Sequence, residues 1–171
     1  MRTFVVVAVL ALVALGGCAD DNSWGTAAPA HVPSAAARLA CGTDAASDIT
    51  TSLGVGVTAP VRPVSAGSRT SCEFVFAAGT MMLSVADHPS AAAASAAFAR
   101  SRPPGAAAVP GLGQQAYALD DGTTVVRKDA SVLTVDVSGL PATFGVPPHP
   151  RNLDAITVAG TVLACWTEDG Q

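Results

Sequence analysis

Charged and aromatic residues are both scarce in this chain. Lys, Arg, Asp and Glu together make up 13% of the 171 residues, aromatic residues make up 5%, and lysine occurs once, as Lys128. Proteins that bind nucleic acid or an anionic surface need clustered Lys and Arg side chains. No such cluster occurs here, and the formal net charge is −4. The composition therefore argues against nucleic acid as a partner.

The sequence signatures of common catalytic and metal sites are also missing. No G-x-S-x-G nucleophile elbow is present, and Ser65-Ala66-Gly67-Ser68 does not match one. The chain has neither a C-x-x-C motif nor a close pair of histidines to hold zinc. Gly111-Leu112-Gly113 lacks the following helix and the spacing of a phosphate-binding loop. We therefore expect no metal, no cofactor and no catalytic residues of a familiar type.

Two segments with acidic residues still need an interpretation. Asp87 is followed by His88, and this pair could begin an acid–base or metal site. Adjacent residues at the end of a strand point to opposite faces, so we interpret His88 as a residue at the start of a helix. Asp120 and Asp121 precede Gly122 and could bind calcium. A turn with aspartate before glycine forms without an ion, however, and we expect a turn there.

The longest apolar run, Phe4 to Leu15, is shorter than the roughly 20 residues that a membrane-spanning helix needs. Arg2 precedes this run, and the small residues Gly16 and Gly17 follow it. A basic start, an apolar stretch and small residues at a cleavage site are typical of a secretory signal peptide. Because Cys18 comes next, the segment resembles a bacterial lipobox. We expect cleavage between Gly17 and Cys18 and a lipid on Cys18; a plain signal peptide with an incidental Cys18 is the alternative.

The lipobox divides the chain into three regions: a signal peptide (1–17), a flexible tether (18–37) and a single extracytoplasmic domain (38–171). Prolines and the absence of an apolar period favour a linker in the second region. Without Arg2 the mature chain has eight basic residues against 13 acidic ones. Two acyl chains, palmitate among them, hold a protein stably in a bilayer. We therefore expect a lipid-anchored protein at the outer face of the cytoplasmic membrane.

Export also permits disulfide bonds. Once Cys18 carries lipid, Cys41, Cys72 and Cys165 remain. We favour a Cys41–Cys72 disulfide, closing a loop of about 30 residues, because these cysteines fall at the starts of two elements that can pack together. Cys165 is then the free thiol. Pairing of Cys165 with either of the other two is the alternative.

Alternating apolar residues predict an antiparallel sheet. Ser71–Ala77 and Met81–Val85 have period-two patterns on either side of a glycine turn, which indicates a hairpin. Residues 54–69 are predicted to form a loop or one edge strand. Three further strands are predicted at 115–119, 123–128 and 131–137.

Helical periodicity predicts helices at 43–53, 89–100 and 151–166. Gly54 is expected to end the first helix. The third helix carries a stripe that is expected to face the sheet, consisting of Leu153, Ile156, Ala159, Leu163 and Trp166. Together these patterns predict an α+β fold, with an antiparallel sheet of about five strands and two or three helices packed on one face.

The order of these features resembles that of small actinobacterial cell-envelope lipoproteins, a family with no assigned catalytic residues. The resemblance rests on the lipobox and on features that follow it in order, namely a tether, Cys41, Cys72, Val109–Gly113, Asp121-Gly122, Val125–Arg127 and Cys165-Trp166-Thr167. It implies an envelope location and a single α+β domain.

Two classes of function remain. The first is a non-catalytic, lipid-anchored envelope lipoprotein that binds a small ligand or a partner protein. The second is an extracytoplasmic hydrolase with an unrecognised site. An apolar hollow with a few converging polar groups would favour the first class. A hollow that holds Asp87, His88 and a serine together would favour the second.

Overall fold

The computed structural model describes residues 32–166. The predicted signal peptide, the cleavage site at Gly17 and Cys18, and most of the predicted tether lie outside the described residues. No helix within 32–166 has both the length and the hydropathy that crossing a bilayer would require.

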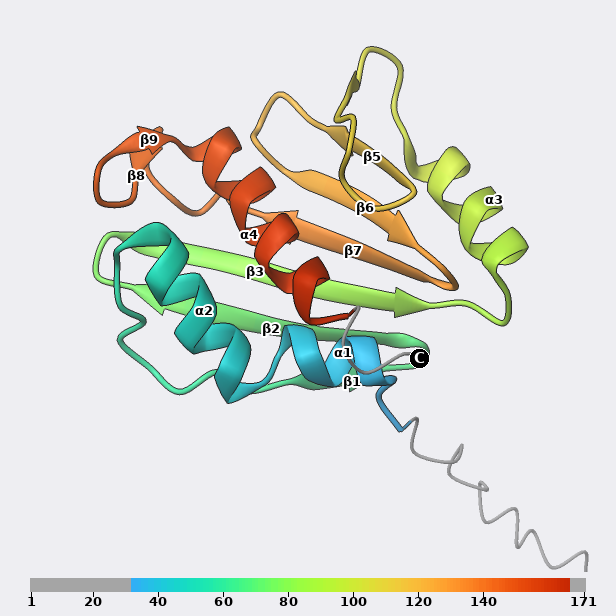
Figure 1. Cartoon of the computed structure of the whole chain (residues 1–171), viewed down its shortest axis with the longest axis horizontal. Coiled ribbons are helices and arrows are strands. Elements are labelled where there is room, and N and C mark those ends of the chain that lie inside the picture. Colours follow the sequence, from blue (N-terminus) through green and yellow to red (C-terminus); the bar gives the residue numbers. More distant parts are fainter. Residues whose placement is uncertain (1–31, 167–171) are drawn as a thin grey trace, which may run out of the picture. The chain divides into compact units, whose positions relative to one another are not determined.

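A seven-stranded antiparallel sheet forms the centre of the fold (Figure 1). The strand order is β1-β2-β3-β7-β6-β5-β4, so that the β2–β3 hairpin lies beside the strands of the second half of the chain. The fold class agrees with the α+β prediction, although the sheet has more strands than the five expected. The strands are β1 (Val64–Ala66), β2 (Arg69–Phe76), β3 (Gly79–Asp87), β4 (Ala107–Ala108), β5 (Gln115–Ala118), β6 (Thr124–Lys128) and β7 (Ser131–Asp136), with β8 (Thr143–Phe144) and β9 (His149–Pro150) forming a separate pair.

The predicted hairpin forms, although Gly79 belongs to β3 and not to the turn. Phe74 lies opposite Met81, and the turn follows Phe76, which pairs with Gly79. Period-two patterning decides which side of β2 is buried, because Cys72, Phe74 and Phe76 face the core while Glu73 between them is exposed.

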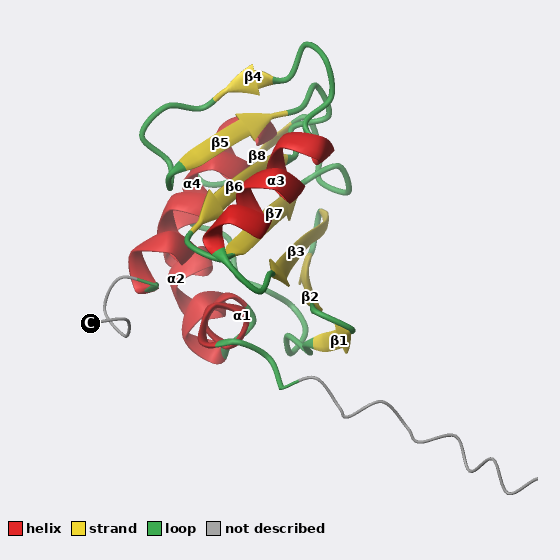
Figure 2. Ribbon diagram, turned by 90° about the vertical axis from the view of Figure 1, so that its right-hand side faces the viewer, coloured by secondary structure: helices red, strands yellow, loops and turns green. Residues whose placement is uncertain are grey.

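Helices cover both faces of the sheet, so the prediction of helices on one face was wrong. Helices α1 (Ala35–Ala40), α2 (Thr43–Leu53) and α4 (Arg151–Cys165) pack on the first face. Helix α3 (Ala91–Ser101) packs on the second face, where Ala94 and Phe98 contact Tyr117, Val125 and Val132 (Figure 2). The apolar positions on the second face of β5, β6 and β7 provide the surface that α3 buries. No helix among the described residues covers the second face of β1–β3.

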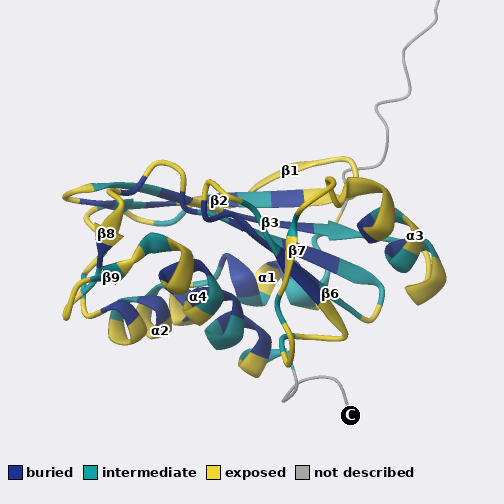
Figure 3. Cartoon of the chain, turned by 90° about the horizontal axis from the view of Figure 1, so that it is seen from above, coloured by how far each residue is buried: buried dark blue, intermediate teal, exposed yellow. Residues whose placement is uncertain are grey.

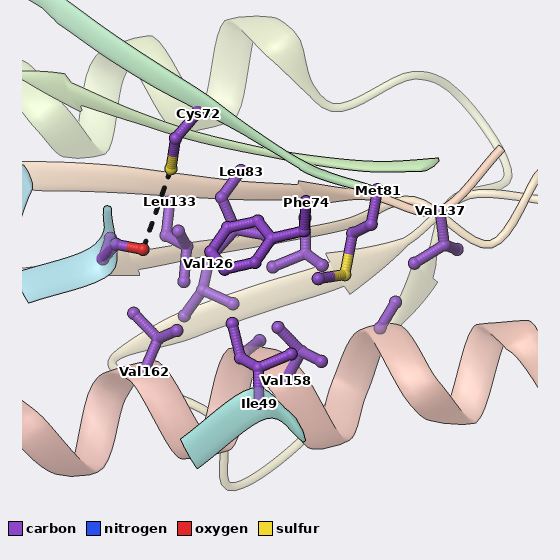
Figure 4. Packing of buried hydrophobic residues seen from close by; sticks show 14 of the residues in the cluster. Ile49, Cys72, Phe74, Met81, Leu83, Val126, Leu133, Val137, Val158 and Val162 are labelled. Carbon is purple, nitrogen blue, oxygen red and sulfur yellow. Dashed lines mark hydrogen bonds between the residues drawn. The ribbon is translucent and has the colours of Figure 1, made fainter. Parts of the chain in front are cut away.

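The main core lies between the first face and its three helices. The buried parts of the strands and helices turn toward one another there (Figure 3). Strand side chains meet Ile49 of α2 and Val158 and Val162 of α4 (Figure 4). The largest fully buried side chains of this core include Phe74, Met81, Leu83, Val126, Leu133, Val135 and Val137.

Helix α4 has the predicted extent, but only Ala159 and Leu163 of the predicted stripe are buried. Its buried apolar residues are Ala155, Val158, Ala159, Val162 and Leu163, whereas Leu153 is 48% exposed and Trp166 is half-buried. The sequence of α4 is apolar around most of its circumference, so several stripes satisfy helical spacing. Small residues at 155 and 159 allow the helix to approach the sheet closely, and this contact selects the face.

Helix α1 lies partly within the segment expected to be a tether. Ser34 caps it by accepting a hydrogen bond from Ala37 N at 3.0 Å, and Ala37 and Ala40 are fully buried. The helix begins three residues before the expected start of the domain. Alanine-rich sequence after a proline carries little apolar periodicity, so the prediction missed this helix.

The Cys41–Cys72 disulfide links the end of α1 to β2, with a Cα–Cα distance of 5.7 Å, as predicted. Cys165 is the last residue of α4 and takes no part in this bond. Its Sγ atom contacts Asp48 Oδ2 and Thr161 O, each at 3.7 Å.

Candidate functional site

A hollow of about 450 Å³ lies where β1, β2 and β3 meet the segment that precedes β1. We call it the edge hollow. Its volume falls within the roughly 300–1,000 Å³ that is usual for ligand sites. Its apolar lining consists of Ala59, Pro60, Val64, Cys72, Val75 and Met82.

Two exposed apolar side chains distinguish the edge hollow from the rest of the described surface. Val64 is 67% exposed and Met82 is 39% exposed. The other large exposed apolar residues between 32 and 166, Val32, Val146 and Leu153, do not line it. Exposed apolar groups that converge on one concavity indicate a binding surface more strongly than scattered ones do.

Three polar residues also line the edge hollow: Arg62, Ser71 and Glu73. The Arg62 and Glu73 side chains are exposed and have opposite formal charges, so the two charges cancel. Arg69 of β2 does not line the hollow, and its Nη1 atom donates to Ser84 Oγ of β3 at 3.0 Å. The arrangement can therefore bind an apolar group and offer hydrogen bonds without favouring a strongly charged ligand.

The hollow exists because the chain leaves the edge of β2 and then rejoins it. Thr58 N donates to Val75 O at 2.7 Å, and Val64 pairs with Ser71. Between these two contacts, Pro60 lacks an N–H group with which to continue the pairing. The segment 59–63 therefore bows away from β2 opposite Glu73.

Asp87 and His88, the candidates for a catalytic site, do not line the edge hollow together with a serine. Ser131 Oγ donates directly to Asp87 Oδ1 at 2.8 Å, and the His88 backbone N–H donates to Ala130 O at 2.8 Å. The partner of the Ser131 hydroxyl group is thus the Asp87 carboxylate and not the imidazole of a Ser-His pair. Neither residue lines the edge hollow. The two contacts hold the β3 end against the β6–β7 turn.

The predicted turn residues have structural hydrogen bonds. Asp121 Oδ1 accepts from Thr123 N at 2.8 Å, which closes the turn before β6. Asp129 has a positive φ of 52°, and its backbone N–H donates to Gln114 Oε1 at 2.8 Å. No group of three or more His, Cys, Asp or Glu side chains is placed to hold a metal ion in the described part of the chain.

His149 and Asp154 form a pair that no sequence motif indicates. Asp154, in the first turn of α4, is 2% exposed, and its Oδ1 atom lies 3.4 Å from His149 Nδ1. Burial raises the pKa of Asp154 above its ordinary value of 3.8, and the charge of His149 and the hydrogen bond to it oppose part of that rise. His149 lies in β9 and Asp154 lies in α4. Neither the strand period of two nor the helix period of 3.6 therefore indicates that these two residues are neighbours.

We expect Asp154→Asn to change the pH dependence of stability. Because the pKa is raised in the folded state, ionisation above pH 3.8 is less favourable there than in the unfolded chain. The free energy of unfolding of the wild type should therefore fall relative to that of the Asn variant as pH rises from 3.8 through the folded pKa. Urea unfolding of both proteins between about pH 3.5 and 5.5, below the usual range of histidine titration, measures this difference. A difference that stays flat or shrinks with rising pH would contradict the assignment.

Neither a scan against protein-family models nor a search of the curated proteins returns a match to this chain.

Proposed function

We propose that this protein is a non-catalytic, lipid-anchored binding protein of the cell envelope, with the edge hollow as its ligand site. The observation that carries the proposal is the convergence of Val64 and Met82 on a concavity that also offers Ser71, Arg62 and Glu73. This combination of apolar walls with a few polar groups is typical of binding sites. The lipobox at Leu15–Cys18 supports the location.

Native mass spectrometry of the mature protein, purified from its host membrane, tests ligand binding. We expect an additional mass that is lost in a Met82→Glu variant, since that change places a charge in the apolar part of the hollow. Leu153→Glu is the matched control, because it places the same charge on an exposed apolar residue of α4. Retention of the added mass in Met82→Glu would place the ligand elsewhere.

Cys18→Ala is expected to release the protein from the membrane fraction. The lipobox ends at Cys18, and the longest apolar run is too short to anchor the protein as a spanning helix. Fractionation of cells that express the wild type or the variant measures the effect. Tight membrane association of the alanine variant would show that anchoring does not depend on a lipid at Cys18.

A further inference from the structure

The edge hollow contains main-chain groups as well as side chains. Along an antiparallel strand, the N–H and C=O groups of alternate residues point to the same neighbour. Val75 O accepts from Thr58 N, and Ser71 pairs with Val64, so the edge groups of residues 75 and 71 face the β1 side. Glu73 lies midway between these two residues and must direct its N–H and C=O groups the same way.

Nothing in the described chain pairs with Glu73 at that edge. Strand β1 reaches only Ser71, and the one backbone hydrogen bond from the preceding segment goes to Val75. The bowed segment between them contains Pro60 and Pro63, neither of which has an N–H group to donate. One donor and one acceptor of a strand edge therefore open into an apolar hollow.

An extended polypeptide is the ligand whose chemistry matches this arrangement. Its main chain supplies both an acceptor for the Glu73 N–H and a donor for the Glu73 C=O, as in strand addition at a sheet edge. Its side chains alternate, so one of them can enter the hollow against Val64 and Met82. The opposite charges of Arg62 and Glu73 favour a segment with little net charge, and they do not favour a phosphorylated or sulfated ligand.

We propose that the edge hollow binds an extended, largely uncharged polypeptide segment, one residue of which pairs with the main chain of Glu73 while an apolar side chain fills the hollow. This proposal rests on the proposed function, because it assigns a ligand class to the same site. The segment belongs to a partner protein of the envelope.

Selection of a random heptapeptide library displayed on phage against the mature protein tests the proposal. Met82→Glu serves as the counter-selection target. We expect enriched peptides to share an apolar residue flanked by residues of high strand propensity. The strongest enriched peptide, once synthesised, should bind Met82→Glu at least about tenfold more weakly than it binds the wild type or Leu153→Glu.

Hydrogen exchange of single amides then tests the main-chain contact. Binding of the synthesised peptide should slow exchange of the Glu73 amide by about tenfold or more. The Phe74 amide is the internal control, because it points toward β3 and is already paired. Glu73→Pro removes the N–H donor at the strand edge without removing a hydrogen bond between β2 and β3, so it should weaken peptide binding about tenfold. Glu73→Ala keeps this N–H group, and its affinity for the peptide should stay within about threefold of the wild type.

The outcomes separate this inference from the proposed function. If no peptide is enriched over Met82→Glu, but the apolar dye N-phenyl-1-naphthylamine binds the wild type and not Met82→Glu, the ligand class is wrong and the binding site stands. Peptide binding that leaves Glu73 exchange unchanged would also overturn the inference. If neither peptide nor dye binds at the hollow, both this inference and the proposed function are wrong. Self-association that Met82→Glu abolishes would show that a second copy is the occupant.

Discussion

Replacing Cys41 and Cys72 together with alanine is expected to lower the free energy of unfolding by about 3–4 kcal/mol. The two cysteines are 31 residues apart in sequence, so the bond restricts a long loop in the unfolded chain. Their side chains are only 5% and 2% exposed, which adds lost packing to the loss of the cross-link. Urea unfolding followed by circular dichroism, with and without a reducing agent, measures the change.

Cys165→Ala is the matched control for this experiment. Its side chain is half-buried in the last turn of α4 and lies outside the disulfide, so the cost should stay within about 1 kcal/mol. Reducing agent should destabilise the wild type and Cys165→Ala and leave the double variant unchanged. A wild type that is insensitive to reductant would contradict the assigned role of the bond.

The central hairpin and the three later strands could be predicted from the sequence because local patterning decides them. Cys72, Phe74 and Phe76 are buried, whereas Glu73 and Val75 between them are exposed or half-buried, and this period of two is typical of a strand with one buried face. The same reasoning could not place α3. Its apolar residues indicate that it packs on something, but the choice between the two faces depends on non-local contacts with Tyr117 and Val132.

The edge hollow was beyond prediction for a related reason. The interval 54–69 could be interpreted as a loop or an edge strand, and the structure contains both. Whether this segment pairs with β2 opposite Glu73 depends on which β2 residues Thr58 and Val64 contact. Two prolines and the turn between β1 and β2 together determine those contacts. The spacing of Pro60 and Pro63 is the one sequence signal that could have suggested an interruption there.

Phe74→Ala is expected to cost roughly 3–5 kcal/mol of unfolding free energy, which is the usual range for a buried aromatic residue. Phe74 is fully buried, lies opposite Met81 in the hairpin, and points toward Ile49 of α2 (Figure 4). Truncation would leave a cavity between the sheet and the helices, and neighbours held in regular elements can close it only in part. Because domains of this size are stable by about 5–15 kcal/mol, the variant should melt far below the wild type.

Leu153→Ala provides the contrasting measurement, since it removes a large apolar side chain that is 48% exposed. Its cost should remain within about 0.5 kcal/mol. The comparison also tests the orientation of α4, because the stripe expected from sequence would bury Leu153 against the sheet. Thermal melts of the two variants beside the wild type decide the matter. Comparable losses in both would show that Leu153 packs in the core and that α4 is rotated from the position described for Val158 and Val162.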